Sequence, residues 1–275
     1  MRVPTLPRPE LTRRQWLGAM AGAIAWVGTA SARDWLDIRR RGVPGVFASA
    51  NEAEGRGPRL LRYEAAVPAG HPLHGARLEL RRKPMPAARG GKRAVLGGTD
   101  LVVELRDAKG KRICGLAREG EKLWVSHGAA PINTDRALFL DAPGLDTPLA
   151  LFAVLELAPR YDGKLEGEFE GTAIVRMRPG YTSGADLEPL KFGVSKRTLQ
   201  TTVTEVDDSK GDMRARLLML DLRWVDDRAV AGTLRLRSAK HEKPLDFRFV
   251  QELVGADATR DPAFRKWGRA ALRAR

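Results

Sequence analysis

Apolar and polar residues alternate in short runs between about residues 59 and 250, and this period of two constrains the fold more than any other feature. Each run spans 4–9 residues and is bounded by Gly, Asp or Lys. Such runs are typical of antiparallel strands with one apolar and one polar face. The clearest alternating sets are Leu61, Tyr63, Ala65 and Val67; Leu78 and Leu80; Leu101, Val103 and Leu105; Ala173, Val175 and Met177; Leu234 and Leu236; Phe247 and Phe249.

Turn residues between these runs indicate hairpins. Gly110 lies in the turn 107–111, and acidic residues with a glycine fill the connection 207–212. Asp226 and Asp227 make a further connection, so residues 213–250 are predicted to form a three-stranded meander. Its first strand is expected to place Leu218, Leu220, Leu222 and Trp224 opposite Leu217, Met219, Asp221 and Arg223.

Residues 146–161 (DTPLALFAVLELAPRY) break the alternation and predict a helix. Thr147 is its expected N-cap, and Pro148 takes the first helical position. The segment is apolar nearly all round, so it requires burial on more than one side. It is expected either to lie against the sheet or to plug an apolar cavity.

Residues 1–32 have the pattern of an export signal. Arg13 and Arg14 precede a short apolar run, and Ala30-Ser31-Ala32 supplies a small-residue cleavage pattern. The arginine pair resembles a twin-arginine signal, while the run is too short and too rich in Gly and Ala for a spanning helix. A periplasmic protein that begins near Arg33 is therefore predicted; the alternative is an N-terminal membrane anchor, and the choice between the Sec and Tat routes stays open.

The net charge bears on the class of binding partner, and the single cysteine bears on disulfide bonding. Removal of four arginines and one glutamate with residues 1–32 lowers the formal net charge from +14 to +11. In an exported protein such a charge favours anionic lipid or another acidic surface over nucleic acid. Cys114 is the only cysteine, which excludes an internal disulfide, and its apolar neighbours favour a buried core position over a reactive thiol.

The sequence contains no motif that indicates catalysis. His71 and His74 lie in a Gly/Pro loop without a nearby Cys or carboxylate partner, so a metal site is not expected. The acidic pairs Asp207-Asp208 and Asp226-Asp227 lie at turns, where Asp is favoured in any case. The prediction is a protein that is not an enzyme and carries neither metal nor cofactor.

Four segments between about residues 116 and 264 resemble the LolA/LolB superfamily, in particular its branch of outer membrane lipoprotein-sorting proteins. LAREGEKLWVSHGAAPIN resembles the family's strand that ends in a Trp before a proline-containing turn, and LFAVLEL resembles its central helix. YDGKLEGEFEGTAIVRMRPG is similar to a strand pair that ends in a proline. LMLDLRWVDDRAVAGTLRLRSAKHEKPLDFRFVQELVGADATRDPAF is similar to the closing meander and final segment. The long basic loop from Lys83 to Gly98 departs from the family pattern.

The resemblance implies an α+β, mostly antiparallel fold: a half-open β-barrel of about ten strands, with helices covering its open face. Residues 33–264 would form this single domain, followed by a basic tail at 265–275. Known relatives carry lipid-modified proteins or lipids across the periplasm, and no catalytic residue comes with the resemblance. Each position named as cavity lining has ordinary core packing as its alternative. The candidate lining is Trp124, Phe152, Leu155, Val175, Met177, Leu220, Leu222, Trp224, Leu236 and Phe249.

The basic tail has two interpretations. Phe264, Trp267, Ala271 and Leu272 lie near one face of a helix, with Arg265, Lys266, Arg269, Arg273 and Arg275 around them. This pattern suits an anionic membrane surface, and the alternative is a solvated tail.

Two functions are carried forward. The first is a periplasmic carrier that holds the acyl chains of a lipoprotein or lipid, with a possible inner-membrane transporter as partner. The second is a non-catalytic envelope interaction or sensor module with the same half-barrel packed shut.

Overall fold

The computed structural model describes residues 57–84, 99–119, 122–126, 131–133, 139–142, 145–152, 161–169, 171–179, 189–197, 200–207, 210–225, 228–239 and 241–273. The predicted signal peptide at 1–32, most of the basic loop and the turn at Asp226-Asp227 lie outside these residues.

In the described residues thirteen strands form one antiparallel sheet, with the order β6-β5-β4-β3-β2-β1-β15-β14-β13-β12-β11-β10-β9. Its first part contains β1 (Arg59–Ala65), β2 (Arg77–Pro84), β3 (Thr99–Arg106), β4 (Arg112–Glu119), β5 (Lys122–Ser126) and β6 (Ile132–Asn133). Its second part contains β9 (Tyr161–Phe169), β10 (Thr172–Pro179), β11 (Leu190–Ser195), β12 (Thr201–Asp207), β13 (Met213–Val225), β14 (Arg228–Ser238) and β15 (His241–Val254). The predicted meander over 213–250 is confirmed as β13, β14 and β15.

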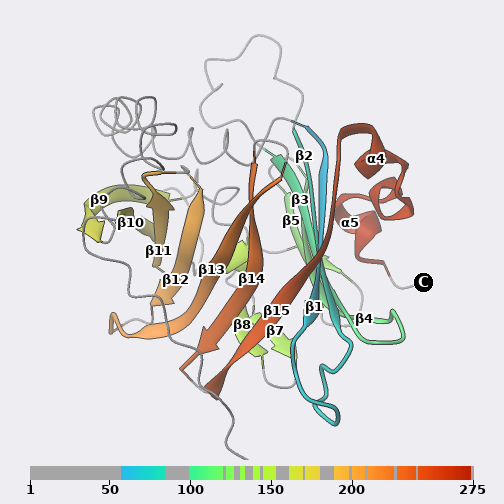
Figure 1. The fold of residues 1–275 in the computed structure, drawn as a ribbon, viewed down its shortest axis with the longest axis horizontal. Coiled ribbons are helices and arrows are strands. Elements are labelled where there is room, and N and C mark those ends of the chain that lie inside the picture. The colour runs from blue at the N-terminus through green and yellow to red at the C-terminus, as the bar shows by residue number, and fades with distance from the viewer. Residues whose placement is uncertain are drawn as a thin grey trace, which may run out of the picture.

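Nearly every strand pairs with its neighbour in the sequence, and the pairing of β1 with β15 is the exception. This pairing joins the two parts into one strongly curved sheet (Figure 1). In the described residues β6 and β9 are the two edge strands of the sheet. They do not pair with each other, so the sheet is open. The prediction of a mostly antiparallel, open sheet is confirmed, with thirteen strands where about ten were expected.

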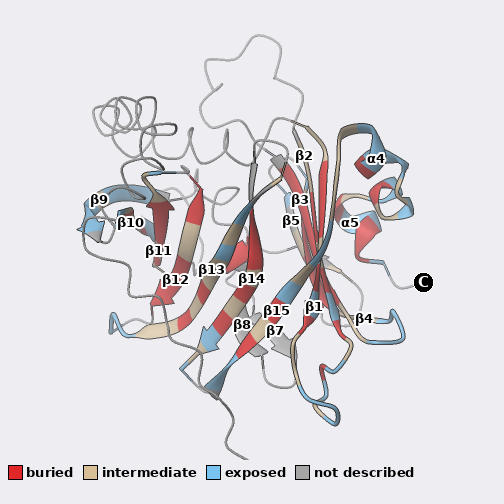
Figure 2. Cartoon of the chain, in the orientation of Figure 1, coloured by how far each residue is buried: buried red, intermediate tan, exposed pale blue. Residues whose placement is uncertain are grey.

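The inner face of the sheet carries the main apolar cluster. Figure 2 shows that buried residues recur along strands of both parts of the sheet. The predicted inward rows of β1, β2, β3, β10, β14 and β15 all belong to it, from Leu61 in β1 to Phe247 in β15. Cys114 is also buried in this cluster, as predicted. On these six strands a period of two was sufficient to identify the core face.

Strand β13 departs from the predicted alternation. Asp221 has φ 53°, a left-handed conformation within the strand, and it lies across from Gly232, where a Cβ atom would meet the Asp221 carbonyl oxygen at 2.8 Å. Leu217 belongs to the core cluster and Met219 packs against it, whereas the sequence pattern assigned both to the opposite face. The left-handed residue interrupts the alternation, since Leu222 packs against the same cluster on its far side.

The predicted helix over 146–161 begins instead as a strand. Strand β7 (Phe139–Ala142) pairs with β8 (Leu145–Pro148) in a separate two-stranded sheet, so Thr147 is a strand residue and not an N-cap. A short 3₁₀-helix, η1 (Leu149–Phe152), follows directly, and residues 153–160 lie outside the described part. Because η1 contacts β12 and β13, and β8 contacts β13 and β14, this connection crosses the inner face of the sheet.

The C-terminal segment comprises α4 (Gly255–Arg260), η3 (Pro262–Arg265) and α5 (Gly268–Ala271), and it covers the outer face of the sheet (Figure 1). Leu60 packs there against Ala258 and Phe264, while its neighbour Leu61 points into the inner cluster. These helices therefore lie on the face of the sheet opposite to the inner cluster. Phe264, Ala271 and Leu272, three of the apolar side chains predicted to face a membrane, are buried. They pack against the sheet instead.

Polar contacts fix the same segment. Arg62 Nη2 donates to both carboxylate oxygens of Asp261 at 3.0 and 2.9 Å, and Arg62 Nε donates to Glu79 at 3.0 Å. Hydrogen bonds and charges from these two carboxylates raise the pKa of Arg62 above its usual value, although burial opposes them as the largest single influence. The Asp261 carboxylate also accepts the Ala263 amide at 2.9 Å and so caps η3.

The packing of the C-terminal segment can be tested at Leu272, which is 0% exposed. We expect Leu272→Ala to lower the free energy of unfolding by about 2–5 kcal/mol because it leaves a cavity between α5 and the sheet. Arg265→Ala, at an exposed position of the same segment, should change it by less than about 0.5 kcal/mol. Urea unfolding of both variants provides the measurement, and equal effects would contradict a docked segment.

Candidate functional site

A cavity of about 50 Å³ lies between the inner face of the sheet and η1. Strands β1, β2, β13 and β14 supply its apolar wall, η1 supplies Phe152, and the residues before and within β12 supply polar groups. It is lined by Arg59, Leu61, Tyr63, Leu80, Arg82, Phe152, Gln200, Thr201, Leu217, Met219, Val230, Ala231 and Leu234.

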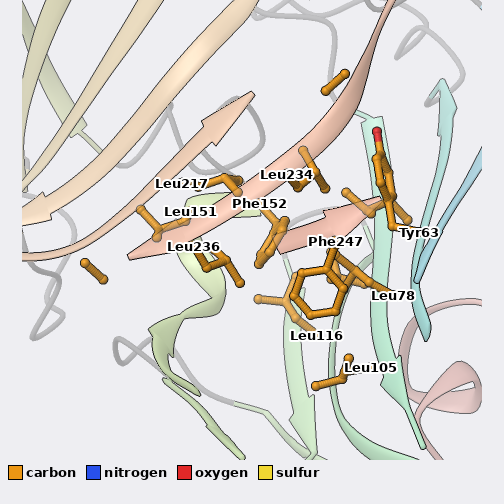
Figure 3. Packing of buried hydrophobic residues seen from close by; sticks show 14 of the residues in the cluster. Tyr63, Leu78, Leu105, Leu116, Leu151, Phe152, Leu217, Leu234, Leu236 and Phe247 are labelled. Atoms are coloured by element: carbon orange, nitrogen blue, oxygen red, sulfur yellow. The ribbon is translucent and has the colours of Figure 1, made fainter. Parts of the chain in front are cut away.

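Phe152 lies near the centre of this arrangement. Figure 3 shows its ring among Leu234, Leu236 and Phe247, side chains that belong to β14 and β15. Two polar side chains hold the backbone of η1 in place: Thr204 Oγ1 donates to the Leu151 carbonyl at 2.9 Å, and Arg82 Nη2 donates to the Phe152 carbonyl at 3.3 Å. The 3₁₀ segment therefore plugs the inner face with Leu151 and Phe152, and hydrogen bonds satisfy both of their carbonyls.

One end of the cavity is polar and charged. Arg59 Nε donates to Glu252 at 2.5 Å, and both side chains are almost completely buried. Arg82, Gln200 and Thr201 line the same space. A cavity with an apolar wall and guanidinium groups at one end matches an amphiphile, because apolar and oxygen-bearing parts of one molecule would each find a suitable surface.

Tyr63 lies beside these charges. Its ring packs edge to face on Phe249, with centroids 5.9 Å apart. Burial raises the pKa of the Tyr63 phenol above its usual value of 10, because the charged form loses its hydration; Arg59 opposes this shift and Glu252 adds to it.

Six of the ten predicted lining residues belong to the main apolar cluster of the inner face or pack against it. Phe152 lines the cavity itself, and Val175, Met177 and Leu236 are buried in the surrounding core. Leu222 and Phe249 are half-buried and pack against it.

Of the other four predicted residues, two lie away from the main cluster and two lie outside the described part. Trp124 packs under α5 with Ala271 and Leu272 on the outer face, because Val125 takes the inward position of β5. Leu220 is half-buried and is not among the described residues of the main cluster, since β13 turns Leu217 and Met219 inward. Trp224 lies in β13 with its side chain outside the described part, and Leu155 lies wholly outside it.

Sequence reasoning missed most of the wall. Leu61, Tyr63 and Leu80 were recognised as inward-facing, but no signal separated cavity lining from ordinary core. Nothing in the sequence indicated that Arg59 and Arg82 line a cavity, since arginines at strand ends are normally solvated.

The two histidines of the Gly/Pro loop have ordinary structural contacts. His71 Nδ1 accepts the Leu73 amide at 3.1 Å, and His74 Nδ1 lies 3.3 Å from the Val67 carbonyl. Within the described residues no group of three or more His, Cys, Asp or Glu side chains is placed to hold a metal ion. No helix in that part of the chain is long and apolar enough to span a membrane.

Neither a family model nor a curated protein matches the sequence. Solved structures do match it. A DUF1329 family protein from Desulfovibrio piger ATCC 29098 has a TM-score of 0.54 at 12% sequence identity, covering 80% of this chain and 96% of that chain. The two proteins share a fold.

Two further structures are similar at lower TM-scores. A LolA superfamily protein from Nitrosomonas europaea has a TM-score of 0.48 at 11% identity, covering 77% of this chain and 92% of that one. A putative outer membrane lipoprotein-sorting protein domain from Vibrio parahaemolyticus has a TM-score of 0.47 at 11% identity, covering 79% and 93%. The open, mostly antiparallel sheet that the resemblance of the sequence implies is observed in the structure itself.

The burial of Tyr63 predicts a specific alkaline titration. Because the pKa of the Tyr63 phenol is raised in the folded state, the neutral phenol contributes its full stabilisation below pH 10. This contribution is lost as the pH rises above 10, where the unfolded chain ionises first. Comparison of the protein with Tyr63→Phe isolates its signal among the three tyrosines. We expect no Tyr63 tyrosinate absorbance near pH 10 in the folded protein and an ordinary signal in urea. A Tyr63 titration at its usual pH in the folded protein would refute this burial.

Proposed function

We propose that the chain is an exported, non-catalytic binding protein that takes an acyl chain of a lipid or lipid-modified protein against the inner face of its sheet. The observation that carries this proposal is the apolar cavity closed by η1, in which Phe152 occupies the centre of the inner cluster. The fold shared with known structures and the resemblance of the sequence to lipoprotein-sorting proteins support it. The signal-like segment at 1–32 supports a periplasmic location.

The proposal requires a movement, because about 50 Å³ does not hold an acyl chain and ligand pockets usually measure 300–1,000 Å³. The apolar part of the ligand would replace Leu151 and Phe152. Burial of a Phe side chain contributes about 1.5–3 kcal/mol, whereas each acyl methylene contributes about 0.8 kcal/mol. A chain of about ten methylenes therefore outweighs the two plug residues together, before the cost of ordering the chain.

The polar end of the cavity gives such a ligand an orientation. Arg82 Nη2 bonds the Phe152 carbonyl in the closed form, and this donor would be released when η1 moves. A ligand ester or carboxylate oxygen is a suitable new partner for it. The ligand head would then lie toward Arg82, and its chain would follow Leu234 and Met219.

A second candidate function is an envelope interaction or sensor module that keeps its cavity shut. The small volume of the cavity within the described residues favours it. The two functions differ in whether the plug gives way to lipid.

Filling the cavity should block uptake. We expect Met219→Trp to weaken binding of a fluorescent fatty acid by about tenfold or more, because the larger side chain occupies the wall on which the chain would lie. Val250→Trp introduces the same residue at a position that is 56% exposed, and it should bind as the unaltered protein does. Fluorescence titration of both variants decides the matter, with urea unfolding to confirm that each is folded; equal affinities would refute the proposed site.

Removing the plug should have the opposite effect. We expect Phe152→Ala to lower the free energy of unfolding by about 3–5 kcal/mol and to tighten acyl binding, because the ligand no longer has to displace the ring. Native mass spectrometry of the variant purified from the cell envelope should then show more bound lipid than the unaltered protein. A loss of stability without any lipid uptake in either protein would favour the interaction module.

A further inference from the structure

A second, larger pocket lies on the outer face of the sheet, under the C-terminal segment. It has a volume of about 280 Å³. Its floor comes from β2, β3, β4 and the turn between β3 and β4, and its rim comes from η3 and the residues around α5. It is lined by Arg81, Glu104, Arg106, Gly110, Lys111, Arg112, Pro262, Ala263, Lys266, Ala271 and Arg273.

The charge of this outer pocket is strongly unbalanced. Six of the lining side chains are cationic and one, Glu104, is anionic. Glu104 is 1% exposed and is shared by three guanidinium groups: Arg81 bonds one oxygen, and Arg106 and Arg112 lie 2.8 and 3.5 Å from the other. One carboxylate therefore serves three cations, and the remaining positive charge faces the pocket without compensation from its lining.

Two of the arginines are held rigidly and have an unused donor. The side chains of Arg81 and Arg112 are only 3% and 8% exposed. Arg81 Nη1 donates to the Ala263 carbonyl, and Arg112 donates to the carbonyls of Ala271 and Leu272. The Nε atoms of both are buried and lack a hydrogen-bond partner within the described residues. Burial also lowers the pKa of Arg81, which indicates that its charge is poorly solvated there.

Structural anchoring explains only part of this arrangement. Arg81 and Arg112 fasten η3 and the end of α5 to the sheet, so their presence needs no ligand. Lys111 lies in the turn between β3 and β4, and Lys266 follows η3. Both are exposed, and the carbonyls named above accept from Arg81 and Arg112 and not from these lysines. Cations brought together around a hollow repel one another, and a bound anion would relieve that repulsion.

We propose that the outer pocket binds a phosphate-type oxyanion, either as a small soluble phosphate ester or as the phosphate of a lipid headgroup. Guanidinium groups match the planar pairs of phosphate oxygens, and the two lysines supply point charges that can follow the remaining oxygens. The volume admits a phosphate with a small attached group such as glycerol, but not an acyl chain. The site is on the opposite face of the sheet from the acyl cavity and does not rest on the proposed function.

The test uses the two lysines, because they line the pocket without anchoring the C-terminal segment. Binding of inorganic phosphate and of glycerol 3-phosphate is measured by isothermal titration calorimetry at constant ionic strength. We expect Lys111→Gln with Lys266→Gln to weaken binding by about tenfold or more. The matched control is Lys109→Gln with Arg265→Gln, which removes the same charge from exposed neighbours that do not line the pocket.

The control pair should bind within about twofold of the unaltered protein, because diffuse surface charge is screened by salt. Equal weakening in both pairs would overturn the proposal in favour of a general attraction to the basic surface. Absence of binding of either phosphate would overturn it for soluble esters. Urea unfolding of each pair confirms that the C-terminal segment remains docked.

A sedimentation experiment separates the two sources of phosphate. Vesicles of phosphatidylcholine with and without phosphatidylglycerol are spun with the protein and with both variant pairs. Binding to the anionic vesicles that is lost only in the Lys111/Lys266 pair, and is competed by glycerol 3-phosphate, identifies the headgroup as the source. Phosphate binding without vesicle binding identifies a soluble ester. Failure of both assays overturns the proposal, whatever the acyl-binding experiments show.

Discussion

The pairing of β1 with β15 is the contact on which the rest of the structure depends. It joins strands nearly two hundred positions apart, for example through Arg59 and Glu252, which are separated by 193 residues. All other pairings among the described strands of the sheet are between successive strands, so they form at low entropic cost. Only this one brings the two series of hairpins into a single curved surface, and it places Tyr63 against Phe249 at the wall of the cavity. The C-terminal segment also depends on it, because α4 begins where β15 ends.

The same strands serve two chemically different surfaces. In β2, Leu78 and Leu80 point into the apolar cluster, while Arg81 points outward into a pocket lined by charge. In β3, Val103 and Leu105 face inward and Glu104 faces outward beneath the C-terminal segment. Because a strand presents alternate residues to opposite sides, one stretch of sequence can build an apolar cavity and a basic pocket back to back. The coverage of the outer face by η3 and α5 turns what would be a solvated charged face into a confined one.

Much of this fold was predictable from the sequence, because its period of two is so regular. Leu61, Leu101 and Val175 were each placed correctly on the inner face by alternation alone. Prediction failed where one residue broke the period. Asp221 adopts a left-handed conformation that its sequence context does not indicate, so the alternation was assigned correctly at Leu222 but to the wrong faces at Leu217 and Met219. It also failed for Trp124, since an aromatic residue fits an outer apolar cluster as well as an inner one. The basic outer pocket was beyond sequence reasoning, because Lys266 reaches Arg81 and Arg112 only once β15 has paired with β1.

The way in which η1 is held explains why it suits the role of a displaceable plug. Among its described side chains, Leu151 and Phe152 are buried against the sheet, and Thr204 and Arg82 donate hydrogen bonds to their carbonyls. Each neutral hydrogen bond contributes about 0.5–1.5 kcal/mol, and one to a charged donor about 1.5–3 kcal/mol. A paired strand of the sheet is held instead by a ladder along its length and by side-chain packing on the inner face, so it resists removal far more strongly. Among the described elements that face the cavity, η1 is thus the one whose release costs least, and in the proposed function an acyl chain would replace its apolar contacts one methylene at a time.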